Sequence, residues 1–218
     1  MLSCIVFGSS GATGRELIDH LSRSQGWKNV FVVTRRMIPS FDALATDPKF
    51  KFIVLDNIMD EQKIKEEVST HSIDAVFNLL GTRVNVGEEQ FRRIDKEYVL
   101  RSAELARELK ARQFSHITCK GNSANSMFLY MRVKGEVEAE LAKVQLPNIS
   151  VFKPGLLIGR DNDSRFGEKV ASCIPFIDKI TTQNLAKAIL NEAEANLLDN
   201  RTNGYKTYSH KECENLAK

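Results

Sequence analysis

The chain has 218 residues, which is long enough for one α/β domain or for a domain with a small appendage. Its formal net charge is only +3 and basic residues are dispersed among acidic ones, which argues against a nucleic-acid partner. No apolar run approaches the ~20 residues of a membrane-spanning helix. The four cysteines lie far apart and share no metal-ligand spacing with the histidines, so we expect reduced thiols in a cytoplasmic protein and no metal site.

The first 36 residues predict a strand, a glycine-rich turn, a helix and a second strand. An apolar run over 2–7 ends at the sequence Gly-Ser-Ser-Gly-Ala-Thr-Gly, which occupies positions 8–14. Leu17 and Leu21 then recur at helical spacing, and a second apolar run covers 30–33. This order is typical of the first βαβ unit of a dinucleotide-binding fold. An ordinary glycine-rich loop is the alternative, which the surrounding βαβ pattern disfavours.

Each glycine of this turn has a physical role in such a fold. Gly8 permits the tight turn out of the strand, Gly11 lets the backbone approach a pyrophosphate, and Gly14 lets the helix pack closely on the sheet. The start of the helix adds free N–H groups and the positive end of its dipole. We therefore expect the phosphates to contact Gly8, Ser10, Gly11, Ala12, Thr13 and Gly14.

The end of the second strand predicts which dinucleotide is bound. NAD-binding proteins usually place Asp or Glu there to hold the ribose 2′-hydroxyl, whereas this chain has Thr34, Arg35 and Arg36. A guanidinium can bind a 2′-phosphate through paired, charge-assisted hydrogen bonds. We expect NADP(H) as the cofactor, with Arg35 as the main contact of the 2′-phosphate and Arg36 assisting. The alternative is that both arginines are solvated surface residues. Arg15 is a weaker candidate for contact with the 2′-phosphate.

Further apolar runs continue the alternation of strands and helices. Strands are predicted over 49–56, 73–80, 114–119 and 149–153, and helices over 64–68, 88–111 and 128–144. Within the longest helix, Asp95, Lys96 and Glu97 are expected to form a solvated face. Asp56 follows a strand and would accept a hydrogen bond from the adenine amino group, although a turn-initiating Asp is an equal alternative. Leu80 ends the next strand and Gly81 and Thr82 follow it, and these residues would lie beside the cofactor ribose.

This alternation predicts an α/β fold of the Rossmann type, a doubly wound parallel sheet with helices on both faces. We expect one domain over 1–218, with a nucleotide-binding core in 1–159 and a small C-terminal substrate lobe in 160–218 over the carboxyl edge of the sheet. In the lobe we predict a polar turn at 161–165, a mixed segment at 166–180, a helix at 182–198, a short strand at 206–208 and a capping box at Ser209 that opens a last helix.

A second motif, Tyr130 and Lys134, predicts acid–base chemistry. Residues four apart share one face of a helix, and a lysine ammonium near a phenol favours the phenolate. The pair follows the fifth strand, where it would face the nicotinamide and where Lys134 would also reach the ribose. An ordinary amphipathic helix is the alternative, since the spacing alone is common. The polar loop at 122–126 is well placed to border a substrate.

The sequence resembles the short-chain dehydrogenase/reductase superfamily, in its atypical, extended-like branch, and more narrowly the Tat-interacting-protein group of NADPH-binding oxidoreductases. The residues that carry the resemblance are the turn at 8–14, Tyr130 with Lys134, the Phe-Lys-Pro-Gly sequence at 152–155, and the segments 95–106 and 128–139. The resemblance is specific up to about Ile158 and looser beyond it.

The resemblance implies a role for each motif residue. Tyr130 would be the proton donor or acceptor, Lys134 would tune it and hold the ribose, and Pro154 and Gly155 would pass under the nicotinamide. The serine that polarises the substrate carbonyl in this family is replaced here by Thr118 and Cys119, of which the spacing to Tyr130 favours Cys119. Because a thiol is a poor hydrogen-bond donor, Thr118 would have to substitute or turnover would be weak. A buried, inert Cys119 is favoured over a reactive thiol.

Two functions remain open on the sequence. The first is an NADP(H)-dependent oxidoreductase that acts on an unknown carbonyl or alcohol substrate. The second is an NADPH-binding regulatory protein that works through protein partners, since the resembling group is linked to nuclear-transport factors and cell-death control; this adds the nucleus as a second location. A sugar-nucleotide epimerase is a weaker third reading, because such enzymes carry a larger C-terminal domain.

Overall fold

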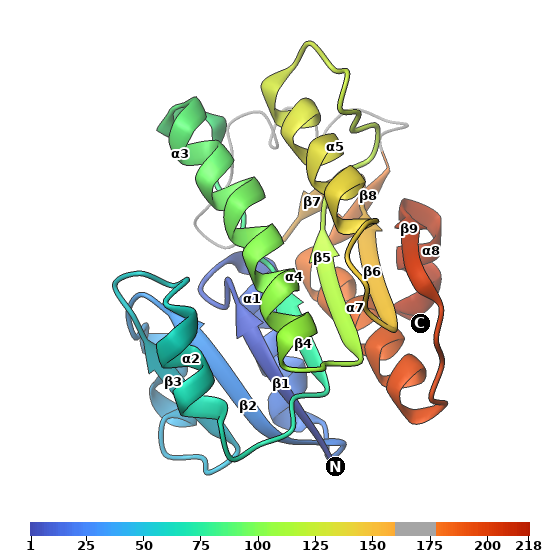
Figure 1. The fold of residues 1–218 in the computed structure, drawn as a ribbon. Helices are drawn as coiled ribbons and strands as arrows, with labels where there is room; N and C mark the ends of the chain where they lie inside the picture. The colour runs from blue at the N-terminus through green and yellow to red at the C-terminus, as the bar shows by residue number, and fades with distance from the viewer. Residues whose placement is uncertain (160–177) are drawn as a thin grey trace.

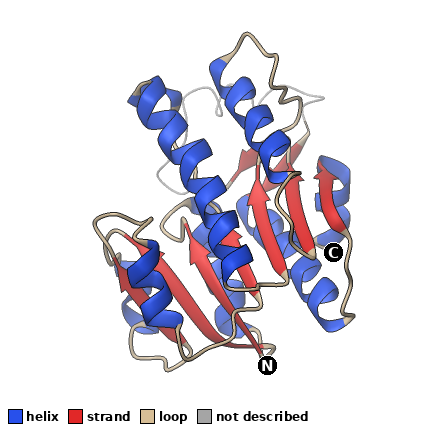
Figure 2. Ribbon diagram, in the orientation of Figure 1, coloured by secondary structure: helices blue, strands red, loops and turns tan. Residues whose placement is uncertain are grey.

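The computed structural model describes residues 1–159 and 178–218. The strands are β1 (Leu2–Phe7), β2 (Trp27–Thr34), β3 (Phe50–Val54), β4 (Ala75–Asn78), β5 (Gln113–Ile117), β6 (Asn148–Lys153), β7 (Leu156–Ile158), β8 (Lys179–Thr181) and β9 (Gly204–Ser209). Seven of them form one parallel sheet in the order β3-β2-β1-β4-β5-β6-β9, and β7 pairs with β8 in a separate small sheet (Figures 1 and 2). This architecture confirms the predicted Rossmann-type α/β fold.

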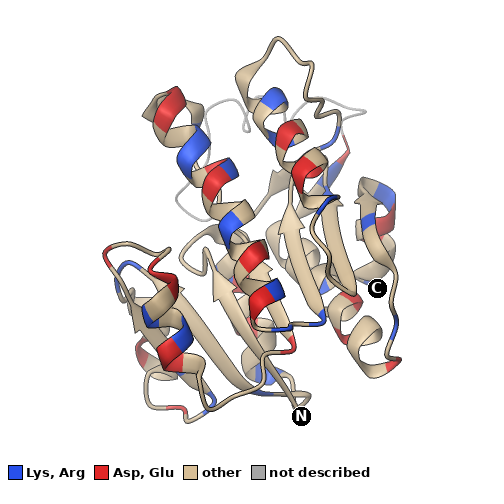
Figure 3. Cartoon of the chain, in the orientation of Figure 1, with Lys and Arg blue, Asp and Glu red and all other residues tan. Residues whose placement is uncertain are grey.

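Helices cover both faces of the main sheet. The α-helices are α1 (Ala12–Arg23), α2 (Glu61–Val68), α3 (Glu88–Arg92), α4 (Tyr98–Glu108), α5 (Leu129–Leu141), α7 (Thr182–Leu198) and α8 (His210–Leu216), and shorter turns are η1 (Pro39–Leu44), η2 (Val84–Val86) and η3 (Arg93–Glu97). In Figure 1, α2, α4 and α5 lie in front of the sheet, and α1 and α7 lie behind it. The outward faces of α4 and α5 carry interspersed acidic and basic residues (Figure 3).

The central strand β1 is apolar except at Ser3, because each of its faces packs against a helical layer. Within β1, Val6 belongs to the cluster under α1 and α7, whereas its neighbour Ile5 belongs to the cluster under α2, α4 and α5. Both side chains are fully buried. A strand buried on both faces has a continuous apolar run rather than an alternating one, which is why this strand was recognisable in the sequence.

The chain reverses its direction across the sheet between β1 and β4. From β1 it proceeds outward through β2 to β3, then returns to place β4 on the other side of β1 and proceeds through β5 and β6 to β9. In open α/β sheets, ligands bind at such a reversal, outside the carboxyl ends of the strands. The glycine turn at 8–14 follows β1 directly, so the fold places it at this position.

The described part of the C-terminal segment, 178–218, does more than border the edge of the sheet. The predicted helix at 182–198 is present as α7 and packs against α1, and the predicted short strand is β9, which pairs with β6. The Ser209 hydroxyl accepts from the backbone N–H of Glu212, and the Glu212 side chain caps Ser209 in return, as the predicted capping box requires. The predicted turn at 161–165, and the mixed segment as far as 177, lie outside the described residues.

A buried carboxylate, Glu192, joins α7 to the sheet. Its side chain is 3% exposed and accepts hydrogen bonds from the Tyr208 hydroxyl at 2.7 Å, from the Gln113 amide at 3.2 Å and from Asn196. Burial raises the pKa of Glu192 above its ordinary value of 4.5, although the hydrogen bonds from Tyr208, Ser150 and Asn196 oppose the shift.

This shift predicts how stability depends on pH. Because the folded state holds the Glu192 proton more tightly than the unfolded state, the stabilising contribution is fully present below pH 4.5 and is lost as the pH rises through the folded pKa. We expect the wild type to lose thermal stability relative to Glu192→Gln as the pH rises from acid to neutral. Melting temperatures of both proteins across this range test it; a difference that is constant or that grows in favour of the wild type would contradict it.

Candidate active site

The turn after β1 brings backbone segments into contact so closely that side chains are excluded. Gly8 has φ +79°, and a Cβ built on it would lie 2.5 Å from the carbonyl carbon of Leu79. A Cβ on Gly14 would lie 2.2 Å from the carbonyl oxygen of Gly8. The N-terminal end of α1 therefore lies directly against the turn, as the roles of these glycines predict.

The polar groups of this turn fit a phosphate group. The helix α1 begins after Gly11 without a side-chain cap, so its first N–H groups have no side-chain acceptor among the described residues. The Ser9 hydroxyl is also orphaned, since Ser9 is 1% exposed and its Oγ has no hydrogen-bond partner in the described part of the chain. Buried polar groups are nearly always paired, so an anion at this turn would complete the set. Ser9 was not among the residues predicted to contact the phosphates.

Two adjoining cavities lie along the carboxyl edge of the sheet. The first, of about 390 Å³, extends from the glycine turn to the ends of β2 and β3. The second, of about 150 Å³, extends from the start of α1 to α5. Both are lined by Gly11 and by residues 79–82, so they form two halves of one groove that crosses the chain reversal between β1 and β4.

The first cavity holds the residues predicted for the adenosine half. It is lined by Gly8, Ser10, Arg35 and Asp56, and the side chains of Arg35 and Asp56 are exposed. The cavity is also lined by helical residues that the sequence did not suggest: Gln90, Arg93, Ile94 and Tyr98. The Arg93 guanidinium lies 5.6 Å from the centre of the Tyr98 ring, within reach of a cation–π interaction.

The second cavity holds the predicted acid–base pair. Tyr130 and Lys134 project from α5 and line it together with Thr82 and Thr118. Ala12, Thr13 and Gly14 form its wall on the side of α1. The ring of Tyr130 packs against that of Phe91, with 5.9 Å between the centroids.

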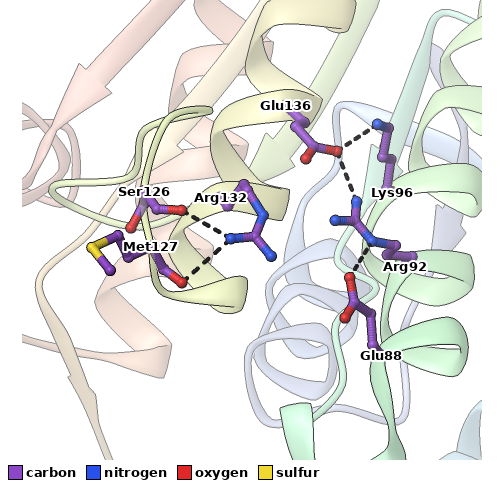
Figure 4. A network of polar contacts seen from close by, with 7 residues as sticks. All are labelled: Glu88, Arg92, Lys96, Ser126, Met127, Arg132 and Glu136. Carbon is purple, nitrogen blue, oxygen red and sulfur yellow. Dashed lines mark hydrogen bonds and ion pairs between the residues drawn. The ribbon is translucent and has the colours of Figure 1, made fainter.

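A network of charges fixes α5 beside the helix that carries Phe91 (Figure 4). Glu136 accepts from Lys96 at 2.6 Å and from Arg92 at 2.9 Å. One turn before Glu136 on α5, Arg132 donates to the carbonyl oxygens of Ser126 and Met127 at 3.1 and 3.3 Å. The position of Tyr130 is thereby tied both to α3 and to the polar loop that precedes α5.

Asp95 is buried beneath the second cavity, contrary to the expectation of a solvated face. Its side chain is 1% exposed, and its Oδ1 lies 2.9 Å from the Lys134 ammonium, which is itself 5% exposed. Its Oδ2 accepts the backbone N–H of Thr82 at 2.7 Å. Burial lowers the pKa of Lys134, but the charge of Asp95 and the proximity of Tyr130 raise it by more, so that the pKa lies above its usual value. Lys134 is therefore an ammonium at neutral pH.

The spacing along the helix explains this burial. Asp95 lies four residues from Phe91 and four from Val99, and both are fully buried, so it continues their stripe. The segment around it, η3, is a π-helical turn, a feature that is frequent at functional sites. Reading the spacing from Phe91 to Val99 in the sequence would have placed Asp95 inside; grouping it with Lys96 and Glu97 by charge placed it outside.

Thr118 and Cys119 do not offer a free hydroxyl to a substrate. The Thr118 hydroxyl donates to Glu138 at 2.6 Å, and the same carboxylate accepts from Asn122 at 2.5 Å and from Lys153 at 2.8 Å. The Cys119 sulfur lies 3.5 Å from that of Met131. Burial raises the pKa of the Cys119 thiol, so that it is protonated at neutral pH and is a poor nucleophile.

Five predicted residues line neither cavity in the described part of the chain: Arg15, Arg36, Cys119, Pro154 and Gly155. The Arg36 side chain is exposed, while its backbone bonds to the Thr34 hydroxyl. Gly155 is packed against Asp178, the residue before β8, because a Cβ on it would lie 2.3 Å from the Asp178 carbonyl oxygen. Leu157, two residues further on, lines the second cavity instead.

Residues 1–159 and 178–218 contain no group of three or more His, Cys, Asp and Glu side chains arranged to hold a metal ion. In the same residues, no helix combines the length and the apolar character that crossing a bilayer requires.

The fold, the glycine turn and the groove define a dinucleotide-binding protein of the extended short-chain dehydrogenase/reductase type. The chain belongs to the NAD dependent epimerase/dehydratase family, whose pattern matches residues 4–124. Among curated relatives, Protein HTATIP2 of Rattus norvegicus is 34% identical over 171 residues, which span 78% of this chain and 68% of that protein. Protein FMP52, mitochondrial, of Lodderomyces elongisporus is 28% identical over 212 residues, spanning 89% and 88%.

Solved structures with the same fold include sugar-nucleotide enzymes. The dTDP-glucose 4,6-dehydratase DesIV of Streptomyces venezuelae, solved with NAD, has a TM-score of 0.74 at 13% identity, covering 95% of this chain and 75% of that one. The UDP-glucuronic acid 4-epimerase of Bacillus cereus, solved with UDP-glucuronic acid and NAD, has a TM-score of 0.70 at 15% identity, covering 95% and 77%. At such identities the likeness shows the fold.

The expected location is corrected by the relatives. FMP52 proteins of Lodderomyces elongisporus and Saccharomyces cerevisiae are named mitochondrial, which contradicts the expectation of a cytoplasmic protein with the nucleus as a second location. That expectation followed from the composition, from the expectation of reduced cysteines and from the partners of the resembling group, and none of these determines the cellular location.

Proposed function

We propose that this protein is an NADP(H)-dependent oxidoreductase that acts on a carbonyl or alcohol substrate. The observation that carries the proposal is the single groove that runs from Arg35, past the glycine turn, to Tyr130 and Lys134. A dinucleotide in this groove would have its 2′-phosphate near Arg35 and its nicotinamide near Tyr130. The nicotinamide supplies a hydride donor or acceptor when it is bound.

In this proposal the residues of the second cavity handle the proton and the orientation of the cofactor. Tyr130 gives its hydroxyl proton to a carbonyl oxygen in the reduction, or takes a proton from an alcohol in the oxidation. Lys134, held as an ammonium, holds the ribose and favours the phenolate that remains after proton transfer. The orphaned Ser9 hydroxyl and the uncapped start of α1 hold the phosphates.

The cofactor preference is tested by Arg35→Glu. We expect the wild type to bind NADPH more tightly than NADH, and the variant to lose about tenfold or more in NADPH affinity while NADH binding is retained, because a carboxylate repels the 2′-phosphate and accepts from a 2′-hydroxyl. Titration calorimetry with both cofactors measures the change. Arg23→Glu, an exposed arginine on α1 outside both cavities, is the control for the change in net charge. Equal affinities of the wild type for both cofactors would remove the 2′-phosphate argument.

The acid–base role is tested by Tyr130→Phe. The variant keeps the ring that packs against Phe91 and loses the hydroxyl, so we expect unchanged NADPH affinity and a loss of turnover of about 100-fold or more. The assay measures the oxidation of NADPH with a panel of aldehydes, ketones and quinones. Tyr205→Phe is the control, because Tyr205 lines neither cavity. Unchanged turnover would eliminate Tyr130 as the acid.

A regulatory protein that binds NADPH without turnover is the second candidate. It is favoured by one observation: the Thr118 hydroxyl is directed to Glu138, and its neighbour Cys119 is a half-buried thiol, so the described residues of this strand end offer no free hydroxyl to a carbonyl. Under this alternative, the wild type binds NADPH and shows no cofactor oxidation with any member of the panel. Cys119→Ser puts a hydroxyl at this position, and turnover gained by this variant would show that the lack of a free hydroxyl is the reason for the inactivity.

A further inference from the structure

Asp95 is a buried charge whose two oxygens join three separate elements at the second cavity. Its Oδ1 pairs with Lys134 of α5 at 2.9 Å, and its Oδ2 accepts the N–H of Thr82, which follows β4, at 2.7 Å. The carboxylate itself comes from the π-helical turn η3. Both partners line the second cavity, and Asp95 lines it as well.

Stability does not account for a charge at this position. Burying a carboxylate and an ammonium requires that both lose their water, and well-packed apolar residues in their place are often at least as stabilising. The stripe that Asp95 continues is apolar, with Phe91 and Val99 on either side of it. An apolar residue at 95 would continue the stripe but would leave the Lys134 ammonium and the Thr82 N–H without this partner.

We propose that Asp95 is a positioning residue that fixes the Lys134 ammonium and the backbone at Thr82 in one arrangement, and thereby sets the affinity of the groove for the nicotinamide half of the cofactor. The inference rests on the proposed function, because it assigns the second cavity to that half. The contacts support it in two ways. Lys134 donates to Asp95 and to the carbonyl oxygen of Ile117 at 3.4 Å, which limits the directions it can take. The Thr82 N–H bond fixes the segment that both cavities share.

The experiment compares two ligands that occupy different lengths of the groove. NADPH would fill both cavities, whereas adenosine 2′,5′-bisphosphate would reach only the first. Asp95→Asn keeps an oxygen that can accept from Thr82 and removes the charge that holds Lys134. We expect this variant to lose about tenfold in NADPH affinity, the equivalent of one charge-assisted hydrogen bond, and to bind adenosine 2′,5′-bisphosphate as the wild type does.

The controls separate the inference from the proposed function. Glu140→Gln removes another ion-paired carboxylate, on α5 but outside both cavities and apart from the contacts that hold Tyr130, and should change neither affinity. Asp95→Glu keeps the buried charge and shifts the carboxylate by one methylene. If Asp95→Asn does not fold, the affinities for NADPH and adenosine 2′,5′-bisphosphate are compared in Asp95→Glu instead. Equal losses for both ligands, or no loss for NADPH, would overturn the inference while leaving the proposed function intact. A wild type that binds neither ligand would overturn both.

Discussion

Lys134→Met is expected to reduce the free energy of unfolding by about 3–5 kcal/mol, the usual effect of removing one partner of a buried ion pair. The reason is the environment of Asp95, which is 1% exposed and would keep the Thr82 N–H but lose its counter-charge. Chemical denaturation without nucleotide measures the change, so that lost cofactor binding does not contribute to it.

Two further variants show whether the buried pair is responsible. Lys96→Met removes a lysine whose ion pair with Glu136 is 29% and 22% exposed, and Glu136 keeps Arg92 as a partner, so we expect a loss below about 1 kcal/mol. Adding Asp95→Asn to Lys134→Met removes the unpaired charge and should restore part of the stability. If Lys134→Met loses no more free energy of unfolding than Lys96→Met does, the buried Asp95 carboxylate does not need Lys134 for the stability of the fold.

Gly14→Ala is expected to destabilise the fold by about 3 kcal/mol and to abolish cofactor binding, because the added methyl group meets backbone that cannot move aside. The new Cβ would lie 2.2 Å from the carbonyl oxygen of Gly8 and 2.8 Å from the Cα of Ser9. Relief of this clash requires α1 to withdraw from the turn, and the withdrawal would open the phosphate cradle. Denaturation curves and an NADPH titration on the same preparation measure both effects.

The matched substitution is Gly26→Ala, in the turn that precedes β2. The nearest atoms to its Cβ would be side-chain oxygens of Ser24 and Glu194, at 3.6 and 3.8 Å, which is ordinary contact. We expect this variant to keep the stability and cofactor affinity of the wild type. NADPH binding by Gly14→Ala at wild-type strength would show that the closeness of α1 to the turn is not required for the phosphate site.

The sequence allowed the sheet to be predicted wherever a strand is buried on both faces. The run at 2–7 belongs to this class, and its neighbours in the sheet, β2 and β4, are buried along most of their length. The edge strand β9 gave a weak signal, because its residues are mostly polar and partly exposed. Its pairing with β6 is a tertiary contact, which local periodicity does not encode.

The site was predictable where function requires a local motif. The turn at 8–14 and the pair Tyr130 and Lys134 line the groove, because in each case neighbours in the sequence are also neighbours on one element. Asp95 was misplaced, because it was grouped with its charged neighbours Lys96 and Glu97 although its spacing from Phe91 and Val99 indicates burial. The contact between the Thr118 hydroxyl and Glu138, which are 20 residues apart, depends on how α5 packs on the sheet.

The packing of α7 against α1 has a consequence for how the protein is made. The layer behind β1 and β2 combines residues from the two ends of the chain; the Trp27 indole N–H, for instance, donates at 2.8 Å to Glu194, which is 167 residues away. During synthesis, the N-terminal strands emerge long before α7, which helps to cover them. Until α7 has been made, part of their apolar face is exposed to solvent or bound by a chaperone. A ribosome-bound chain that ends before 182 is therefore expected to be sensitive to protease and prone to aggregation, whereas release of the last residues completes the layer.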